Sequence, residues 1–253
     1  MVARGRAYPI LYEDRSVIAI DKPAGWMLVP FSWQRTNRNL QAALTSSIAA
    51  RDFWARTRAL RFLRHVHRLD ADTTGVLLLA KSSGAVKTYG DLFESREMDK
   101  TYLAVVHGIP SQSRWTCRIK LAPDPQQIGK MKADRKQGKD SETEFRVIET
   151  LESIALIEAK PLTGRTHQIR VHLREGGHPV VGDELYNPRP SDRGSSIQGS
   201  QEFPLGLRAI GLKFTDPFTR RAVRINAPTQ QFLVTFGFGL AGDGLQDKRG
   251  VDL

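Results

Sequence analysis

The 253-residue sequence has a single cysteine, Cys117, and lacks long apolar runs. One cysteine cannot form an intramolecular disulfide, and it excludes a metal site built mainly from cysteines. No stretch approaches the roughly 18 apolar residues that a membrane-spanning helix requires. The N-terminus carries positive charge but no apolar segment before Glu13 and Asp14, so we expect no signal peptide. These absences predict a cytoplasmic protein.

Acidic residues are too few to balance the basic ones. Lys and Arg number 38 against 27 Asp and Glu, a formal net charge of +11, and Asp52 is the only acid between Trp33 and Arg68. A basic surface without a partner is one interpretation. We favour a nucleic-acid partner, because arginine binds phosphate with two parallel hydrogen bonds. The arginines expected to contact it are Arg56, Arg58, Arg61, Arg64 and Arg68.

Short apolar runs bounded by turn residues predict mostly strands. The expected strands lie at 10–12, 16–21, 26–29, 75–81, 100–108, 114–121, twice within 141–160, at 207–217 and at 221–226. Helices are expected from the cap Asn39 through Phe53, after the cap Ser82, within 163–177 and after Pro228. Residues 51–64 read as a partly helical basic element or a mobile loop, and 122–140 and 188–203 as loops.

Strands outnumber helices, and most neighbouring strands are close enough in sequence to form hairpins. This pattern predicts an α+β fold with a mixed, mainly antiparallel central sheet, flanking helices and a basic cleft. We expect one domain over residues 1–239 and a flexible C-terminal tail over 240–253, where apolar anchors are few.

A charged cluster precedes the apolar strand 75–81 in the stretch HRLDADTTGVLLLAK. Arg68 and Asp70 are two residues apart and point to the same side of an extended segment. Asp70 either caps a turn or is a reactive group that the rigid strand holds in place. Asp72 resembles a turn residue. The nearby pair His65 and His67 has no third ligand, so we expect no metal.

Two further polar residues occupy informative positions. Arg165, in TGRTHQIR, falls at the expected start of a helix, where a cation opposes the helix dipole. It either serves an anion, such as a carboxylate or a phosphate, or is an exposed surface residue. Tyr102 lies in the strand 100–108, where it either packs half-buried or stacks on a flipped nucleobase.

Six segments, in order, resemble motifs of the RluA-type RNA pseudouridine synthase family. HRLDADTTG (67–75) and PLTGRTHQIRVHL (161–173) are the most specific of them. The others are DKPAGWMLV (21–29), KTYLAVVHG (100–108), GHPVVGDELY (177–186) and LRAIGLKFTDP (207–217). Together the six segments cover roughly residues 10 to 226.

The resemblance implies an isomerase that converts uridine in RNA to pseudouridine without a cofactor. It implies that Asp70 is the catalytic aspartate, that Arg165 is its ion-pair partner and that Tyr102 lies against the target uracil. It also implies that Arg68 displaces the target nucleotide from the stack. We expect RNA contacts from His167 and Arg170 as well, a transfer RNA or large-subunit ribosomal RNA substrate, and a monomer.

The sequence departs from the family pattern at three positions. Thr74 stands where serine is common, and Pro30 and Arg208 stand where histidine is common. The chain also begins at the first motif, without the small N-terminal RNA-binding domain of some relatives, so we expect the basic segments 33–68 and 122–140 to grip RNA. The alternatives are a nucleoside hydrolase, which requires two carboxylates across the bond, and an RNA-binding protein without catalysis.

Overall fold

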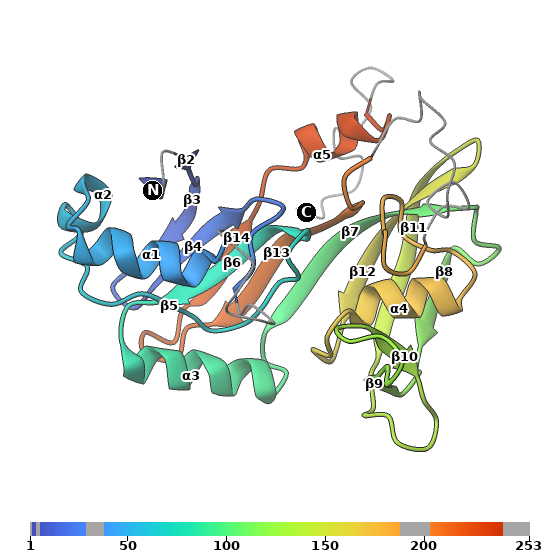
Figure 1. The fold of residues 1–253 in the computed structure, drawn as a ribbon, viewed down its shortest axis with the longest axis horizontal. Helices are drawn as coiled ribbons and strands as arrows, with labels where there is room; N and C mark the ends of the chain where they lie inside the picture. Colours follow the sequence, from blue (N-terminus) through green and yellow to red (C-terminus); the bar gives the residue numbers. More distant parts are fainter. Residues whose placement is uncertain (1, 4–5, 29–37, 188–202, 240–253) are drawn as a thin grey trace.

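A twisted sheet forms the centre of the computed structural model, which describes residues 2–3, 6–28, 38–187 and 203–239 (Figure 1). In the described residues the sheet has ten strands, and every neighbouring pair is antiparallel except β6 and β13, which are parallel. The mixed, mainly antiparallel sheet predicted from the sequence is therefore confirmed. Its main path runs β3 (Ile10–Glu13), β4 (Val17–Lys22), β6 (Thr74–Ala80), β13 (Leu207–Thr215), β7 (Asp99–His107), β12 (Ile154–Pro161), β11 (Thr143–Leu151) and β8 (Arg114–Cys117).

The remaining strands lie beside this path or form small hairpins. β14 (Ala222–Asn226) pairs with β13, and β5 (Arg64–His65) pairs with β6. β1 (Val2–Ala3) pairs with β2 (Arg6–Ala7), and β9 (Leu121–Pro123) pairs with β10 (Met131–Ala133). The helices are α1 (Leu40–Ala49), α2 (Phe53–Arg56), α3 (Ser83–Glu94), α4 (Gln168–Glu175) and α5 (Gln230–Thr235).

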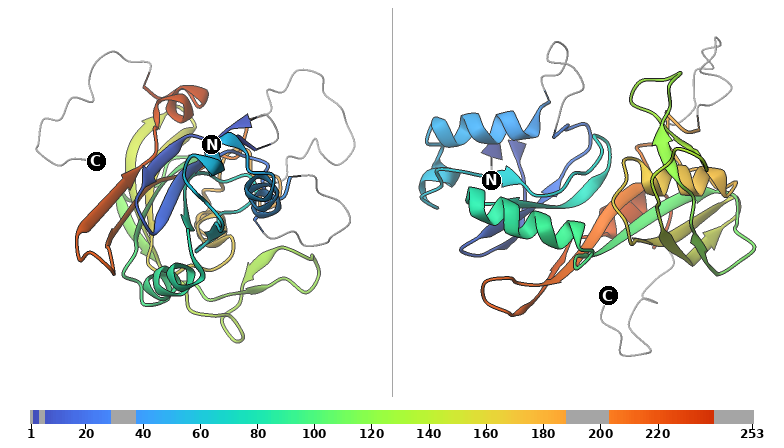
Figure 2. Two further views of the ribbon diagram at one scale, coloured as in Figure 1. Left: turned by 90° about the vertical axis from the view of Figure 1, so that its left-hand side faces the viewer. Right: turned by 90° about the horizontal axis from the view of Figure 1, so that it is seen from below.

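Helices cover both faces of the sheet (Figure 2). On one face, α1 packs over β4 and β6 around Leu44 and Leu77, and α4 packs over β7 and β12 around Leu173. On the other face, α3 and α5 each cover an apolar cluster. Tyr102 of β7 contacts both clusters of the first face. The seam between α1 and α4 therefore lies over the middle of the sheet.

The apolar strand β6 is buried because both of its faces are covered. Leu77 and Leu79 face the α1 cluster, while Val76 and Leu78 face the α3 cluster. This explains the unbroken apolar run, which is typical of a central strand. Gly75 has φ +109°, and a Cβ there would lie 1.9 Å from the backbone oxygen of Ala209 on the parallel neighbour β13. Only glycine allows these two strands to approach so closely.

Both predicted helix caps are confirmed. The side chain of Asn39 accepts a hydrogen bond from the Ala42 amide at 3.0 Å, and Ser82 accepts one from the Ala85 amide at 3.2 Å. The first helix nevertheless ends at Ala49 rather than continuing to Phe53. Arg51 has φ +56°, which breaks the helix and lets the single turn α2 begin at Phe53.

Three other predicted elements differ from the structure. Residues 26–28 form no strand, and Val29 lies outside the described residues. The segment 122–140 is not an open loop but carries part of the β9–β10 hairpin. The helix expected within 163–177 begins only at Gln168. The tail 240–253, most of the loop 188–203, and Pro30 and Arg35 lie outside the described residues.

Candidate active site

Asp70 lies at the seam between α1 and α4, in the loop that leads into β6. Its side chain is 23% exposed, and Arg170 Nη1 lies 3.1 Å from its Oδ2 atom. Arg170 belongs to α4, on the other side of the seam, and is 100 residues away in sequence. The ion pair therefore joins the half of the sheet under α1 to the half under α4.

A second carboxylate holds the guanidinium of Arg170 in place. Arg170 Nε and Nη2 donate to Asp183 Oδ2 and Oδ1 at 2.7 and 2.8 Å, and the Asp183 side chain is fully buried. Burial alone would lower the pKa of Arg170, but the hydrogen bonds and charge of Asp183, followed by those of Asp70, raise the pKa above its ordinary value. Arg170 is thus a permanent cation beside Asp70.

The structure brings Arg170, and not Arg165, to Asp70, where the resemblance implied an ion pair with Arg165. Arg165 Nε donates to the backbone oxygen of Asp140 at 3.0 Å, and the position beside Asp70 belongs to Arg170. Arg165 precedes the helix, in a turn that Gln168 holds by accepting a hydrogen bond from the Arg165 amide. Arg170 was itself predicted to contact RNA. It is only 8% exposed and bound to two carboxylates, so its contact with RNA stays a prediction.

His167 also faces Asp70, from the residue that caps α4. Its Nε2 atom lies 3.8 Å from Asp70 Oδ1, and its Nδ1 atom lies 2.8 Å from the hydroxyl of Tyr186. Burial lowers the pKa of His167, and the charge of Asp70 opposes this effect without cancelling it. His167 therefore lies beside the carboxylate, and its contact with RNA stays a prediction.

Lys22 is hydrogen-bonded to the loop that carries Asp70. The residue is fully buried, and its Nζ atom donates to the backbone oxygens of Ala71 and Thr73 at 2.6 and 3.0 Å. Burial lowers the pKa of Lys22 to about 8, against the opposing charges of Asp72 and Asp70. A buried ammonium group with these acceptors fixes the path of the loop. The motif DKPAG contained this signal, but sequence reasoning assigned Lys22 no role.

Tyr102 lies in β7 at the same seam and is partly exposed. Burial, and then the negative charge of Asp70, raise the pKa of its hydroxyl above the ordinary value. The hydroxyl therefore stays protonated, and the ring offers a neutral aromatic surface. The structure places Tyr102 close enough to Asp70 for the carboxylate charge to act on its hydroxyl.

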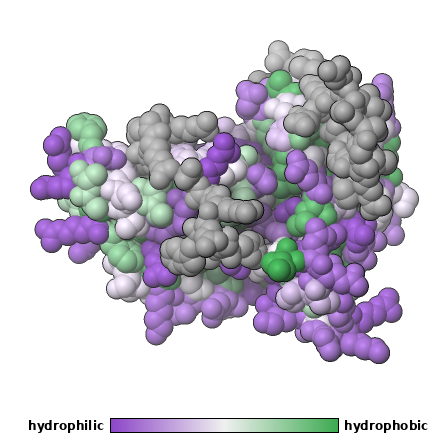
Figure 3. Space-filling model, in the orientation of Figure 1, coloured by the Kyte–Doolittle hydropathy of each residue, from purple (hydrophilic) through white to green (hydrophobic). Residues whose placement is uncertain are grey.

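All five of the arginines on and after α2 that are predicted to contact RNA are exposed. Arg58 also forms an ion pair within the protein, because its Nε atom lies 2.8 Å from Glu13 Oε2. On α2, the Arg56 guanidinium lies 5.9 Å from the ring centre of Phe53, which is 73% exposed. Hydrophilic residues gather around α2 and around the β9–β10 hairpin at the other end of the molecule (Figure 3). The exposed arginines are Arg56, Arg58, Arg61, Arg64 and Arg68.

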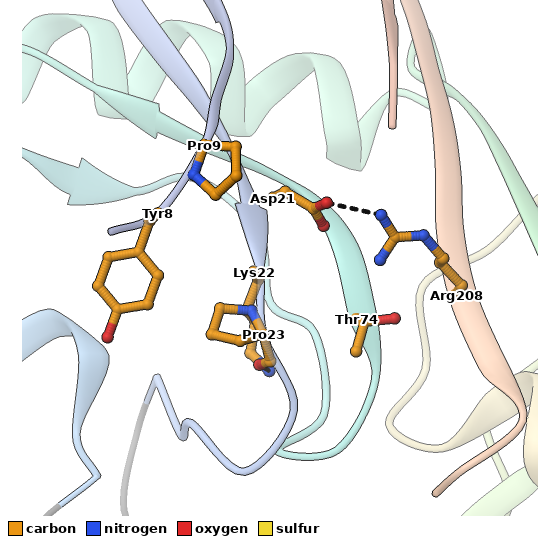
Figure 4. Close-up of a pocket in the computed structure, with 7 residues that line it drawn as sticks. All are labelled: Tyr8, Pro9, Asp21, Lys22, Pro23, Thr74 and Arg208. Atoms are coloured by element: carbon orange, nitrogen blue, oxygen red, sulfur yellow. Dashed lines mark hydrogen bonds and ion pairs between the residues drawn. The ribbon is translucent and has the colours of Figure 1, made fainter. Parts of the chain in front are cut away.

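The arginine that departs from the family pattern is engaged within the protein. Arg208 Nη2 donates to Asp21 Oδ2 at 2.6 Å, and Arg208 Nε donates to the backbone oxygen of Pro228 at 2.9 Å. The pair lines a pocket of about 220 Å³ beside Thr74, at the end of β4 (Figure 4). Arg208 therefore replaces the family's common histidine with an internal ion pair.

Within the described ranges, no three His, Cys, Asp or Glu side chains are placed to hold a metal ion. The pair His65 and His67 instead makes internal contacts: His65 Nδ1 lies 2.9 Å from Gln41 Oε1, and His67 Nε2 accepts from the Leu78 amide at 3.0 Å. No helix in the described part of the chain is both long and apolar enough to cross a membrane.

The fold is similar to those of solved pseudouridine synthase domain structures. The chain is similar to human RNA pseudouridylate synthase domain containing 4, with 25% identity and a TM-score of 0.70 over 89% of this chain and 90% of that one. It is also similar to human RNA pseudouridylate synthase domain containing 1, with 28% identity and a TM-score of 0.67 over 88% and 83% of the two chains. The fold is thus that of a pseudouridine synthase.

Sequence comparison identifies the family. Residues 16–175 match the model of the RNA pseudouridylate synthase family. The chain is 36% identical to ribosomal large subunit pseudouridine synthase C of Escherichia coli over 88% of this chain and 67% of that protein. The protein of the same name in Vibrio vulnificus is 34% identical over 87% and 65%. The chain spans about two thirds of the length of these relatives. It belongs to the RluA-type family of RNA pseudouridine synthases, which are isomerases acting on RNA.

Proposed function

We propose that this chain isomerises specific uridines in RNA to pseudouridine, with the Asp70 carboxylate as the catalytic group. One observation carries the assignment. Asp70 is partly exposed at the seam, and a buried arginine that is itself fixed by Asp183 holds it there. A carboxylate paired in this way is held in one orientation toward the open side of the seam.

The reaction exchanges one bond for another. The bond between ribose C1′ and uracil N1 breaks, the base turns over, and C1′ bonds to uracil C5. The C5 hydrogen leaves to water as a proton and N1 gains a proton, so no oxidant, reductant or hydrolytic water is consumed. Asp70 acts on the sugar or its loosened bond, and the ring of Tyr102 supports the turning base. Arg68, exposed two residues before Asp70, fills the place of the flipped nucleotide.

Large-subunit ribosomal RNA is the substrate class that we favour. The two curated relatives described above carry that substrate in their names. The exposed ring of Phe53 beside Arg56 on α2 supports RNA binding, because bases stack on aromatic and guanidinium planes. The chain's excess of basic residues supplies the electrostatic attraction.

The test is to map pseudouridine in total RNA from cells with and without the gene, and to restore either wild type or Asp70→Ala. We expect one or a few ribosomal sites to disappear and only the wild type to restore them. Sites lost from transfer RNA would move the substrate assignment while keeping the reaction. No lost site, or full rescue by Asp70→Ala, would contradict the proposal.

The hydrolase alternative requires a second carboxylate across the bond. Asp183 is near Asp70, but it is buried and bound to Arg170, and Asp72 is exposed. Release of free uracil from RNA would favour this alternative. Normal RNA binding without isomerisation would favour a binding protein.

A further inference from the structure

A chain of polar contacts runs from the β9–β10 hairpin to Asp70. The backbone amide of Met131, in β10, donates to the Tyr186 hydroxyl at 2.8 Å. The same hydroxyl lies 2.8 Å from His167 Nδ1, and His167 Nε2 lies 3.8 Å from Asp70 Oδ1. One tyrosine hydroxyl therefore stands between the hairpin backbone and the imidazole ring that faces the carboxylate.

The protons in this chain have one favourable arrangement. A neutral imidazole has one donor and one acceptor nitrogen. Since the Tyr186 oxygen accepts from the Met131 amide, its own proton can be donated to His167 Nδ1. The ring proton then sits on Nε2 and points toward Asp70. The other tautomer would aim the Nε2 lone pair at a carboxylate, which is repulsive.

The backbone of His167 is held in a costly conformation. Its φ is +54°, in the left-handed region, at the residue that caps α4. Residues other than glycine rarely adopt this region, and such strain occurs where surrounding contacts hold a functional group. Here the rings of His167 and Tyr186 pack in a T-shaped arrangement, with a centroid distance of 5.6 Å and an interplanar angle of 82°.

Tyr186 is suited to hold this position because it is rigid. It is 4% exposed and packs with Leu121 and Val171. Its ring lies 5.0 Å from the Arg170 guanidinium, and its backbone amide donates to Asp183 Oδ1 at 3.0 Å. Tyr186 thus contacts Arg170, Asp183 and His167, the groups that approach Asp70 from the α4 side.

We propose that Tyr186 is a positioning residue that links the β9–β10 hairpin to the Asp70 carboxylate by fixing the proton of His167 on Nε2. This inference rests on the proposed function of Asp70. The hairpin and its return segment are basic, so RNA is drawn to them. RNA that settles there steadies the Met131 amide, and the steadied contact orients Asp70. The cations concerned are Lys130, Lys132, Arg135, Lys136 and Lys139.

The first test is Tyr186→Phe, which removes the hydroxyl and keeps the ring. At saturating RNA, the single-turnover rate should fall about tenfold, which corresponds to the loss of one hydrogen bond. The affinity for RNA should stay the same. Tyr12→Phe is the matched control, since it also removes a hydroxyl bonded to one side chain, Asp14, at 3.0 Å, and its rate should equal that of wild type. An unchanged rate for Tyr186→Phe would overturn the proposal.

The second test separates positioning from packing by a double-mutant cycle. His167→Asn keeps a polar atom near Tyr186 but removes the group that faces Asp70, so its rate should fall like that of Tyr186→Phe. The double variant should lose no more than either single variant, because both act on one chain of contacts. His167→Gln, which returns a donor toward Asp70, should recover part of the rate. Multiplied losses in the double variant would contradict the link.

The third test does not depend on activity. Nitrogen chemical shifts of the His167 ring report which nitrogen carries the proton. We expect the Nε2–H form in wild type, a mixture in Tyr186→Phe, and faster hydrogen exchange of the Met131 amide in that variant. An Nδ1–H ring in wild type, or unchanged Met131 exchange, would refute the link. If wild type makes no pseudouridine in any RNA, the proposed function fails, whereas these spectra still judge the link.

Discussion

Arg170 Nη1 lies 3.1 Å from Asp70 Oδ2, and this contact joins the loop before β6 to helix α4. The other nitrogens of the same guanidinium bind the buried Asp183. Asp70 is therefore positioned by a cation that cannot move toward it or away from it freely. The arrangement makes the site's activity and the protein's stability depend on the same side chain.

Replacing Arg170 by Lys should lower the single-turnover rate by about a hundredfold or more, because one ammonium group cannot bond Asp70 and both oxygens of Asp183. Arg165→Lys is the matched control in the same segment. The guanidinium of Arg165 donates to a backbone oxygen, that of Asp140, and the substitution leaves the Arg165 amide in place, so this variant should keep a rate near that of wild type. A large loss in Arg165→Lys with a small loss in Arg170→Lys would restore the assignment made from the sequence.

Asp183→Ala should lower the free energy of unfolding by about 3–5 kcal/mol, because it leaves the Arg170 cation buried beside one remaining carboxylate. Glu13→Ala provides the comparison. It breaks pairs with Arg58 and Lys81 that are partly exposed and should cost about 1 kcal/mol or less. Denaturant unfolding of both variants measures the difference, and equal costs would show that burial does not distinguish the two sites.

Lys22 should make stability rise with pH above about 8. Its folded pKa is lowered from 10.5 to about 8, so between these values the unfolded chain binds more protons than the folded one. The stability of wild type relative to Lys22→Met should therefore increase from pH 8 to pH 10.5, by about 3 kcal/mol at most. Other groups, such as Lys100, titrate in both proteins and cancel in the difference. If the stability difference between the two proteins does not change with pH, burial does not disfavour the charged form of Lys22.

Charge reversal at Arg56 and Arg61 should weaken RNA binding and flatten its salt dependence. Each lost phosphate contact removes about 0.7 from the slope of log K against log salt for a single strand. Arg58 is left unchanged, because it pairs with Glu13. Reversal of Arg220 and Arg221, in the turn between β13 and β14, is the control for net charge. Equal effects of the two double variants would mean that binding follows total charge and not the surface around α2.

The sequence by itself determined the elements whose causes are local. The unbroken apolar run 75–81 predicts a buried strand, and β6 is that strand. Asn39 and Ser82 predict helix starts, because short side chains with an oxygen can accept from the free amides of the first helical turn. The order of residues in the chain also predicts that Asp70 lies just before this strand, and in the structure it lies in the loop that leads into β6.

Only the tertiary structure decided which arginine meets Asp70. Arg165 and Arg170 lie five residues apart in one motif, and the sequence-based assignment took the first. The Gln168 side chain accepts from the Arg165 amide and from Thr163 Oγ1, which holds the residues before α4 in a turn that ends at the left-handed His167. The helix begins after that turn, so Arg170 faces inward and Arg165 faces Asp140.

Tertiary contacts are also the reason why the sequence did not indicate roles for Lys22, Asp183 and Tyr186. Each contacts groups that are distant in the chain: Lys22 bonds Thr73, and Asp183 bonds Arg170. No spacing rule connects such partners, since they meet only when the strands of the sheet are assembled. The motifs thus indicate which residue types form the site, while tertiary packing determines which side chains pair to orient Asp70.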